Sequence, residues 1–135
     1  MSESLLALGI QNFGLNLSET NIADLELFLQ EMSRWNQVHN LTAIEGEKDS
    51  VRLHLIDSIA VLPVLRQFLK ELSPKIADLG SGGGLPAIPI AIVQSGWHLT
   101  LIEAVRKKAA FLQHVRGKLK LKNIAVLSER VEYIA

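Results

Sequence analysis

The sequence predicts an α/β fold in which helices precede a doubly wound parallel sheet. Two observations lead to this prediction: residues 1–72 carry apolar side chains at helical spacing, and residues 73–135 alternate short apolar runs with amphipathic stretches. The chain has 135 residues, of which 48% are hydrophobic, enough to form one core. We therefore expect one structural domain, with an N-terminal helical segment at 1–72 packed on a sheet formed by 73–135.

The N-terminal segment shows the signals of helix starts and stops. Ser18 is a candidate N-cap, and an apolar stripe follows it at three- and four-residue steps. A shorter helix is expected at residues 2–13, ended by Gly14. Another is expected from Asp49 to Leu72, broken or kinked at Pro63. The residues of the apolar stripe are Ile22, Leu25, Phe28, Leu29, Met32 and Trp35.

The remainder of the chain alternates strands with helices. Short apolar runs at 75–79, 98–102 and 123–127 predict three strands, and the stretches 85–94 and 105–119 predict the helices between them. Two strand–helix–strand units of this kind form half of a doubly wound sheet. We expect the sheet to have an open edge, which either further strands or a partner would cover.

Composition excludes several classes of protein. The chain has 14 Lys+Arg, 14 Asp+Glu and no cysteine, so disulfide scaffolds and thiolate metal sites are excluded. The four histidines lack metal-type spacing, and no metal is expected. The longest apolar run, Leu85–Val93, is shorter than the roughly 20 residues of a membrane span. With no basic flank at its start, the chain is expected to be cytoplasmic, without a membrane partner.

The balanced net charge conceals an uneven distribution along the sequence. Residues 1–57 carry nine acids and three bases, whereas residues 104–128 carry seven bases and no acid. A one-sided basic segment is typical of a surface that binds a polyanion, although a solvated helix face would look the same. The candidate nucleic-acid contacts are Arg106, Lys107, Lys108 and Lys118.

A glycine-rich turn joins the first predicted strand to the next helix. Gly82, Gly84 and Ala87 fit the dinucleotide fingerprint, which would favour a nicotinamide-dependent oxidoreductase. Asp78 followed by glycines at positions 80, 82 and 84 instead fits S-adenosylmethionine (AdoMet), because a carboxylate accepts hydrogen bonds from an ammonium group and repels a pyrophosphate. Asp78 therefore favours AdoMet over NAD, and a plain tight turn is the third interpretation.

Glu103 directly follows the second predicted strand. A carboxylate at this place can accept hydrogen bonds from both hydroxyls of a ribose, which suits either cofactor. An ordinary exposed loop acid is the alternative. No catalytic triad or pair of carboxylates is visible, which is compatible with methyl transfer to a ring nitrogen that has a free lone pair.

Several motifs together resemble the guanine-N7 methyltransferases of the ribosomal small subunit, RsmG, also called GidB. The similarity covers essentially the whole chain and rests on four stretches. They are Arg34-Trp35-Asn36-Gln37-Val38-His39-Asn40-Leu41-Thr42, His54-Leu55-Ile56-Asp57-Ser58, Asp78-Leu79-Gly80-Ser81-Gly82-Gly83-Gly84-Leu85-Pro86-Ala87-Ile88-Pro89 and Ser128-Glu129-Arg130-Val131-Glu132.

The resemblance implies a Rossmann-like AdoMet-dependent methyltransferase that modifies N7 of a guanine in 16S rRNA. Arg130 then orients the cofactor or the target base, and Asn40 and His54 link the helices to the sheet. Family members continue with further strands and another arginine of the site, which this sequence lacks. The cofactor contacts implied are Asp78, Gly80, Gly82, Gly84, Leu85, Glu103, Val131 and Glu132.

Alternatives to this enzyme remain open. The chain could be a non-catalytic RNA-binding or dimerising fragment that uses its basic helix and its open sheet edge. The expected partner is 16S rRNA or the small ribosomal subunit. A full-length family member is expected to be a monomer, whereas this chain could self-associate through the open edge.

Overall fold

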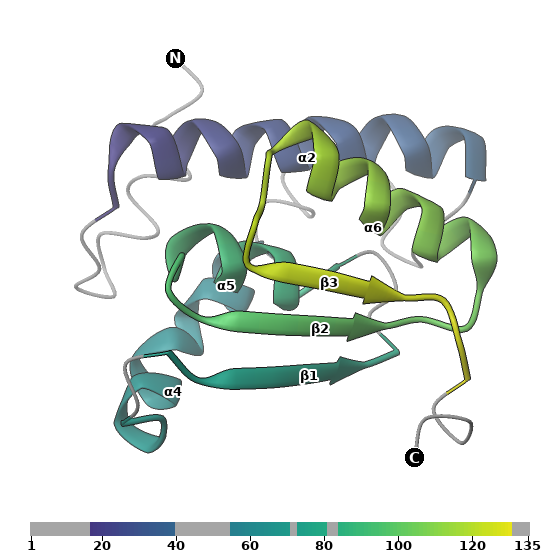
Figure 1. Ribbon diagram of the computed structural model, residues 1–135. Coiled ribbons are helices and arrows are strands. Elements are labelled where there is room, and N and C mark those ends of the chain that lie inside the picture. The colour runs from purple at the N-terminus through teal and green to yellow at the C-terminus, as the bar shows by residue number, and fades with distance from the viewer. Residues whose placement is uncertain (1–16, 40–54, 71–72, 81–83, 131–135) are drawn as a thin grey trace.

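The computed structural model describes residues 17–39, 55–70, 73–80 and 84–130 (Figure 1). The helix expected at 2–13, the stretch 49–54 of the third expected helix, and the residues Asn40 and His54 lie outside these ranges. In the described ranges residues 55–60 are helical, and four helices and three strands make up the rest of the regular structure. In chain order these are α2 (Glu19–His39), α4 (Leu62–Phe68), β1 (Lys75–Leu79), α5 (Ala87–Val93), β2 (His98–Ile102), α6 (Arg106–Lys118) and β3 (Ile124–Leu127).

The three strands form a parallel sheet in the order β1-β2-β3. Lys75 pairs with His98, and Leu99 pairs with Ile124, so the three carboxyl ends lie at one edge. The helices α5 and α6 are the crossovers between neighbouring strands, as parallel pairing requires. The predicted α/β fold with two strand–helix–strand units is therefore confirmed.

Several boundaries differ from the predictions by one or more residues, since α6 spans Arg106–Lys118 instead of 105–119 and α5 ends at Val93 instead of Gln94. The third strand begins at Ile124, one residue later than predicted, although the Asn123 carbonyl already accepts from the Leu99 N–H at 2.9 Å. The helix expected from Leu85 begins at Ala87, since Leu85 and Pro86 form a turn. In the third helical region α4 begins next to Pro63, which fits the first turn of a helix.

Reciprocal hydrogen bonds fix the start of α2. The Asn21 N–H donates to Ser18 Oγ at 3.0 Å, and the Ser18 N–H donates to Asn21 Oδ1 at 3.3 Å. This is a capping box in which Asn takes the place of Glu or Gln. Asn21 Nδ2 also donates to the Ile92 carbonyl at 3.1 Å, so the same residue ties α2 to the end of α5.

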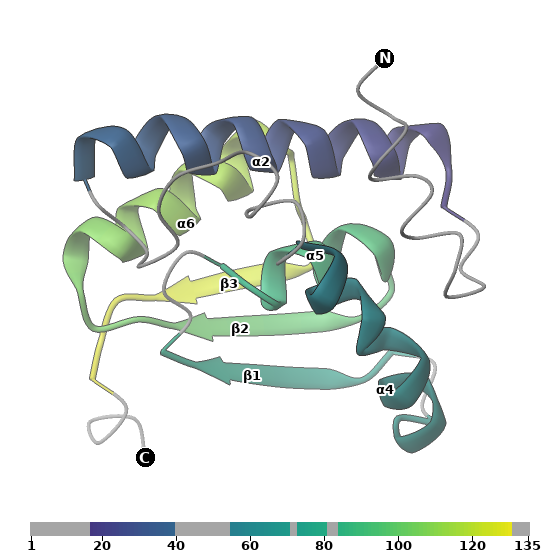
Figure 2. The same cartoon turned by 180° about the vertical axis from the view of Figure 1, so that it is seen from behind.

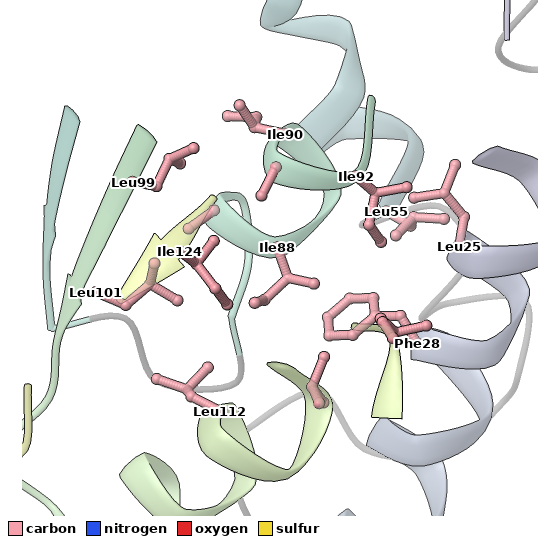
Figure 3. Close-up of a cluster of buried hydrophobic side chains, with 14 of the residues drawn as sticks. Leu25, Phe28, Leu55, Ile88, Ile90, Ile92, Leu99, Leu101, Leu112 and Ile124 are labelled. Atoms are coloured by element: carbon pink, nitrogen blue, oxygen red, sulfur yellow. The ribbon is translucent and has the colours of Figure 1, made fainter. Parts of the chain in front are cut away.

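The core lies between α2, the sheet and the two crossover helices (Figure 3). Six of the seven residues of α5 are buried, because this helix lies between α2 and the sheet. The predicted stripe of α2 faces this core, with Leu25 and Phe28 completely buried. On α6, the predicted side carrying Ala109, Leu112, Val115 and Leu119 is buried as well.

Asn123 holds the chain between α6 and β3 against the end of α5. Its Nδ2 donates to the carbonyls of Ala91 at 3.0 Å, Gln94 at 3.2 Å and Trp97 at 3.0 Å. The first two carbonyls belong to the last turn of α5 and its C-cap, where helical partners are missing. Asn123 therefore supplies hydrogen bonds to carbonyls at the end of α5, where the Gln94 carbonyl also accepts from the Trp97 N–H at 3.0 Å.

Candidate cofactor site

A hollow of about 450 Å³ lies at the carboxyl ends of β1 and β2, the edge at which open α/β sheets bind ligands. Its volume falls within the range of small-molecule pockets, roughly 300–1,000 Å³. The right-hand end of the sheet in Figure 1, where the strand arrows point, is this edge. The hollow is lined by Leu79, Gly80, Ile102, Glu103, Ala104, Glu129 and Arg130.

The two described glycines of the turn have different roles. Gly80 follows β1 with φ +71°, and its N–H donates to the Ile102 carbonyl at 2.8 Å. Among the residues that the structure describes, none has an atom within 4 Å of a Cβ placed on Gly80, so they leave the space beside its backbone open. Gly84, at φ +91°, is instead closely packed, because a Cβ there would lie 2.6 Å from Ile88 Cγ1. Gly80 thus has room beside its backbone, whereas Gly84 serves the packing of the turn on α5.

Glu103 supplies a buried carboxylate to the wall of the hollow. Its Oε2 accepts a hydrogen bond from the Val105 N–H at 2.9 Å, directly before the first residue of α6. The first turn of a helix favours a carboxylate, because its N–H groups lack helical partners. This bond fixes the side chain at the end of β2, where the sequence predicts the ribose-binding acid.

Asp78 and Leu85 lie near the turn but do not line the hollow. Asp78 is half-buried on β1, in register with Leu101, two residues before Gly80. Leu85 is partly buried and packs against the hydrophobic core. Three other predicted cofactor contacts, namely Gly82, Val131 and Glu132, lie outside the described residues.

Arg130 and Glu129 form the opposite wall, on the segment that follows β3. Both residues and Ala104 also line an adjoining hollow of about 470 Å³, together with Arg106 and Ser128. The predicted Arg130 is therefore placed at the site. Glu129, Ala104, Leu79 and Ile102 were not predicted as site residues: Glu129 and Leu79 lie within motif stretches that give them no role of their own, and Ala104 and Ile102 lie outside any motif. Their position follows from strand register, in which Leu79, Ile102 and Leu127 are neighbours.

The candidate nucleic-acid contacts of α6 do not share one side of the helix. Lys107 and Lys118 are both exposed and eleven residues apart, which places them on the same side at 100° per residue. Arg106 is exposed at the adjoining hollow, whereas Lys108 is partly buried. Arg116 points another way, since its Nε donates to the Ile124 carbonyl at 3.0 Å.

A buried carboxylate joins α2 to the middle of α6. Glu31 Oε1 lies 3.3 Å from His114 Nε2, and Glu31 Oε2 lies 3.7 Å from Arg34 Nη1. The His114 ring stacks at 5.0 Å from the Trp35 ring, which in turn lies 5.6 Å from Phe111. This cluster fixes the helix that carries Lys107 and Lys118.

Within the described ranges, no helix is both long and apolar enough to span a bilayer. Nor do the same residues contain a group of three or more His, Asp or Glu side chains that could hold a metal ion.

The parallel sheet with its crossover helices places the chain in the doubly wound α/β class, in which the open glycine and the acid after β2 stand where members of the class bind nucleotide cofactors. Comparison with known proteins is more specific. Residues 21–135 match the model of GidB, described as rRNA small subunit methyltransferase G. The chain belongs to this family.

Similar proteins carry the same description. The chain is 76% identical over 135 residues to ribosomal RNA small subunit methyltransferase G of Polynucleobacter asymbioticus, covering all of this chain and 61% of that protein. It is 45% identical over 127 residues to the protein of that name from Nitrosospira multiformis, covering 94% of this chain and 56% of the relative. It is 43% identical over 138 residues to the protein of that name from Aromatoleum aromaticum, covering 99% of this chain and 63% of that relative. The chain thus spans about 56–63% of the length of these relatives.

Proposed function

We propose that the chain binds AdoMet in the 450 Å³ hollow and serves the methylation of N7 of a guanine in 16S rRNA, in the cytoplasm. The observation that carries this proposal is the combination of the open backbone at Gly80 with the buried Glu103 carboxylate, in a member of an rRNA methyltransferase family. The relatives are named for small-subunit rRNA, which supports the choice of substrate.

The residues at the hollow fit AdoMet. The fixed Glu103 carboxylate suits the ribose hydroxyls, and the space beside Gly80 admits a ligand close to the backbone. Asp78 adds negative charge near the turn, which favours a ligand with an ammonium group over a pyrophosphate. Gly82, Gly84, Leu85, Val131 and Glu132 stay predicted contacts, with Gly84 acting through packing. When bound, AdoMet supplies an electrophilic methyl group on a sulfonium sulfur.

The chain's own residues would act by positioning. A guanine N7 has a free lone pair, so its methylation needs alignment rather than a general base. Arg130 lines both hollows, and we assign it the orientation of the target base or the cofactor. Arg106, Lys107 and Lys118 would hold phosphates of the RNA, with Lys108 contributing less because it is partly buried.

The test is product analysis with a chimera of full family length. In this chimera, residues 1–135 replace the matched part of the 76% identical protein from Polynucleobacter asymbioticus. The chimera is incubated with AdoMet and with small ribosomal subunits that lack the N7 methyl group. We expect 7-methylguanosine in 16S rRNA and at least a tenfold loss of rate in Asp78→Ala and Arg130→Ala. The control Asp57→Asn changes an exposed acid elsewhere. Absence of the product, or methylation of another atom, would contradict the proposal.

A nicotinamide-dependent oxidoreductase is the second candidate, because Glu103 would also suit the ribose of NAD. Asp78 disfavours it through repulsion of the pyrophosphate. NAD is therefore the control ligand wherever AdoMet binding is measured.

A further inference from the structure

The exposed charge changes sign along α2. The four acids of this helix lie at or before Glu31, and its one Lys or Arg residue, Arg34, lies near its end. The Glu31 side chain is almost wholly buried, whereas the Arg34 side chain is 76% exposed. The exposed surface at the end of α2 is therefore basic, and the surface at its start is acidic.

The helix α6 brings further cations to the end of α2. Phe111 of α6 is completely buried, and the centre of its ring lies 5.6 Å from that of Trp35 on α2. Lys107 lies four residues before Phe111, and His114 and Lys118 lie three and seven residues after it. At 100° per residue, all three lie on the side of α6 that meets α2. Both lysines are exposed there, and the His114 side chain is 33% exposed.

The two helices place these groups near the cofactor site. In both views α2 and α6 lie side by side and run in opposite directions, so the end of α2 lies beside the start of α6 (Figures 1 and 2). Arg106, the first residue of α6, lines the hollow that adjoins the cofactor hollow. We call the surface made of Arg34, Lys107, His114 and Lys118 the charged seam.

One acid lies beneath the charged seam and compensates only part of its charge. Glu31 Oε2 lies 3.7 Å from Arg34 Nη1, and Glu31 Oε1 lies 3.3 Å from His114 Nε2. Because this carboxylate is buried, it offers almost no negative surface to a ligand. The helix α6 itself contains no acid. The groups that an approaching polyanion meets at the charged seam are therefore positive.

We propose that the charged seam binds the phosphates of an RNA segment that leads to the cofactor hollow, with Arg34 as a contact on α2 besides the lysines of α6. This inference rests on the proposed function, because that function names RNA as the substrate. A guanidinium group suits the role, since it can hold a phosphate through two parallel hydrogen bonds. The acids near the start of α2 repel phosphates, so the RNA lies at the end of this helix and not along all of it.

The first test measures the affinity of the chain for a 16S rRNA fragment by fluorescence anisotropy. Arg34→Gln should weaken binding about threefold or more and reduce the slope of log K against log salt by roughly 0.7–0.9, because one phosphate contact is lost. Lys70→Gln, just after α4, is the matched control, since it also removes one exposed positive charge. It should leave both quantities nearly unchanged.

A second test locates the RNA independently of charge. The sequence contains no cysteine, so a single introduced thiol carries a photo-cross-linker at one known place. Val38→Cys puts the label one turn after Arg34 on α2, and Val64→Cys puts it on α4, at side chains that are 76% and 51% exposed. With small ribosomal subunits, we expect the label at position 38 to cross-link to 16S rRNA and the label at position 64 not to do so.

Equal effects of Arg34→Gln and Lys70→Gln on RNA affinity, or no cross-link from position 38, would overturn the proposal. Cross-links from position 38 to ribosomal proteins alone would make a protein the partner of the charged seam, and would overturn it as well.

The full-length chimera separates this inference from the proposed function. RNA binding that depends on Arg34, in a chimera that forms no 7-methylguanosine, would support the inference and contradict the function. Methylation and RNA affinity that Arg34→Gln both leaves unchanged would contradict the inference alone.

Discussion

Asn123 donates to three carbonyls with one amide group, and its loss would remove these hydrogen bonds from the interior, although the Gln94 carbonyl would keep its bond from the Trp97 N–H. Asn123→Ala should therefore lower the free energy of unfolding by about 2–4 kcal/mol, since each buried orphaned acceptor costs about 1–3 kcal/mol. Chemical denaturation of the purified chain measures this difference.

Asn123→Asp separates hydrogen bonding from cavity formation. Aspartate has nearly the same volume but offers only acceptors, so it should destabilise the chain at neutral pH at least as much as alanine does. Surface substitutions typically change the free energy of unfolding by less than about 0.5 kcal/mol. If both variants stay within this range of the original chain, the hydrogen bonds of Asn123 contribute little to stability.

The glycine turn shows how far residue patterns reach. The spacing of Asp78 and its glycines correctly locates a strand, a turn and a helix, because these are local features. It does not separate Gly80 from Gly84, because Gly84 is constrained partly by Leu112 on a distant helix. Likewise, the sequence predicts Asn123 as the first residue of a strand. The residues next to it give no sign that its side chain donates to carbonyls 26 to 32 positions earlier in the chain.

Between elements, the contact of α2 with α6 depends on a carboxylate that is almost wholly buried. The Glu31 side chain is 4% exposed and the His114 side chain 33% exposed, at ion-pair distance. His114→Phe keeps a ring against Trp35 but removes the partner of the buried charge. Because Arg34 still neutralises part of it, we expect a loss of about 1–2 kcal/mol, below the 3–5 kcal/mol typical of a fully buried pair.

The double variant Glu31→Gln/His114→Phe tests the cause of this loss. It removes the buried charge together with its partner and should recover most of the stability. Chemical denaturation of the single and double variants in one buffer measures the difference. Equal instability of the single and double variants would assign the effect to packing alone.

The exposed side of α6 is the element that we expect to contact RNA. Lys107→Glu/Lys118→Glu should weaken binding to a 16S rRNA fragment at least tenfold. It should also reduce the slope of log K against log salt by about 1.4–1.8, because two phosphate contacts are lost. Fluorescence anisotropy at several salt concentrations measures both quantities.

Lys70→Glu/Lys75→Glu is the matched control, because it makes the same change of charge at exposed residues outside α6. If both double variants weaken binding equally, net charge rather than a surface on α6 governs the affinity. An unchanged affinity in Lys107→Glu/Lys118→Glu would remove α6 from the RNA interface.

For the molecule as a whole, sequence periodicity predicts most elements but not how they assemble into a site. The apolar stripes of α2 and α6 and the three strands are local patterns, and the structure contains them. The second wall of the hollow, with Glu129 and Ala104, depends on strand register and on the path after β3.

The central claim is that the hollow at β1 and β2 is an AdoMet site, and calorimetric titration of the chain with S-adenosylhomocysteine tests it most directly. We expect S-adenosylhomocysteine to bind and NAD not to bind. Glu103→Gln should weaken that binding by roughly tenfold or more, since hydrogen bonds to a charged acceptor contribute about 1.5–3 kcal/mol. The control Asp57→Asn should leave it unchanged. Preference for NAD, or binding that is indifferent to Glu103→Gln, would contradict the account.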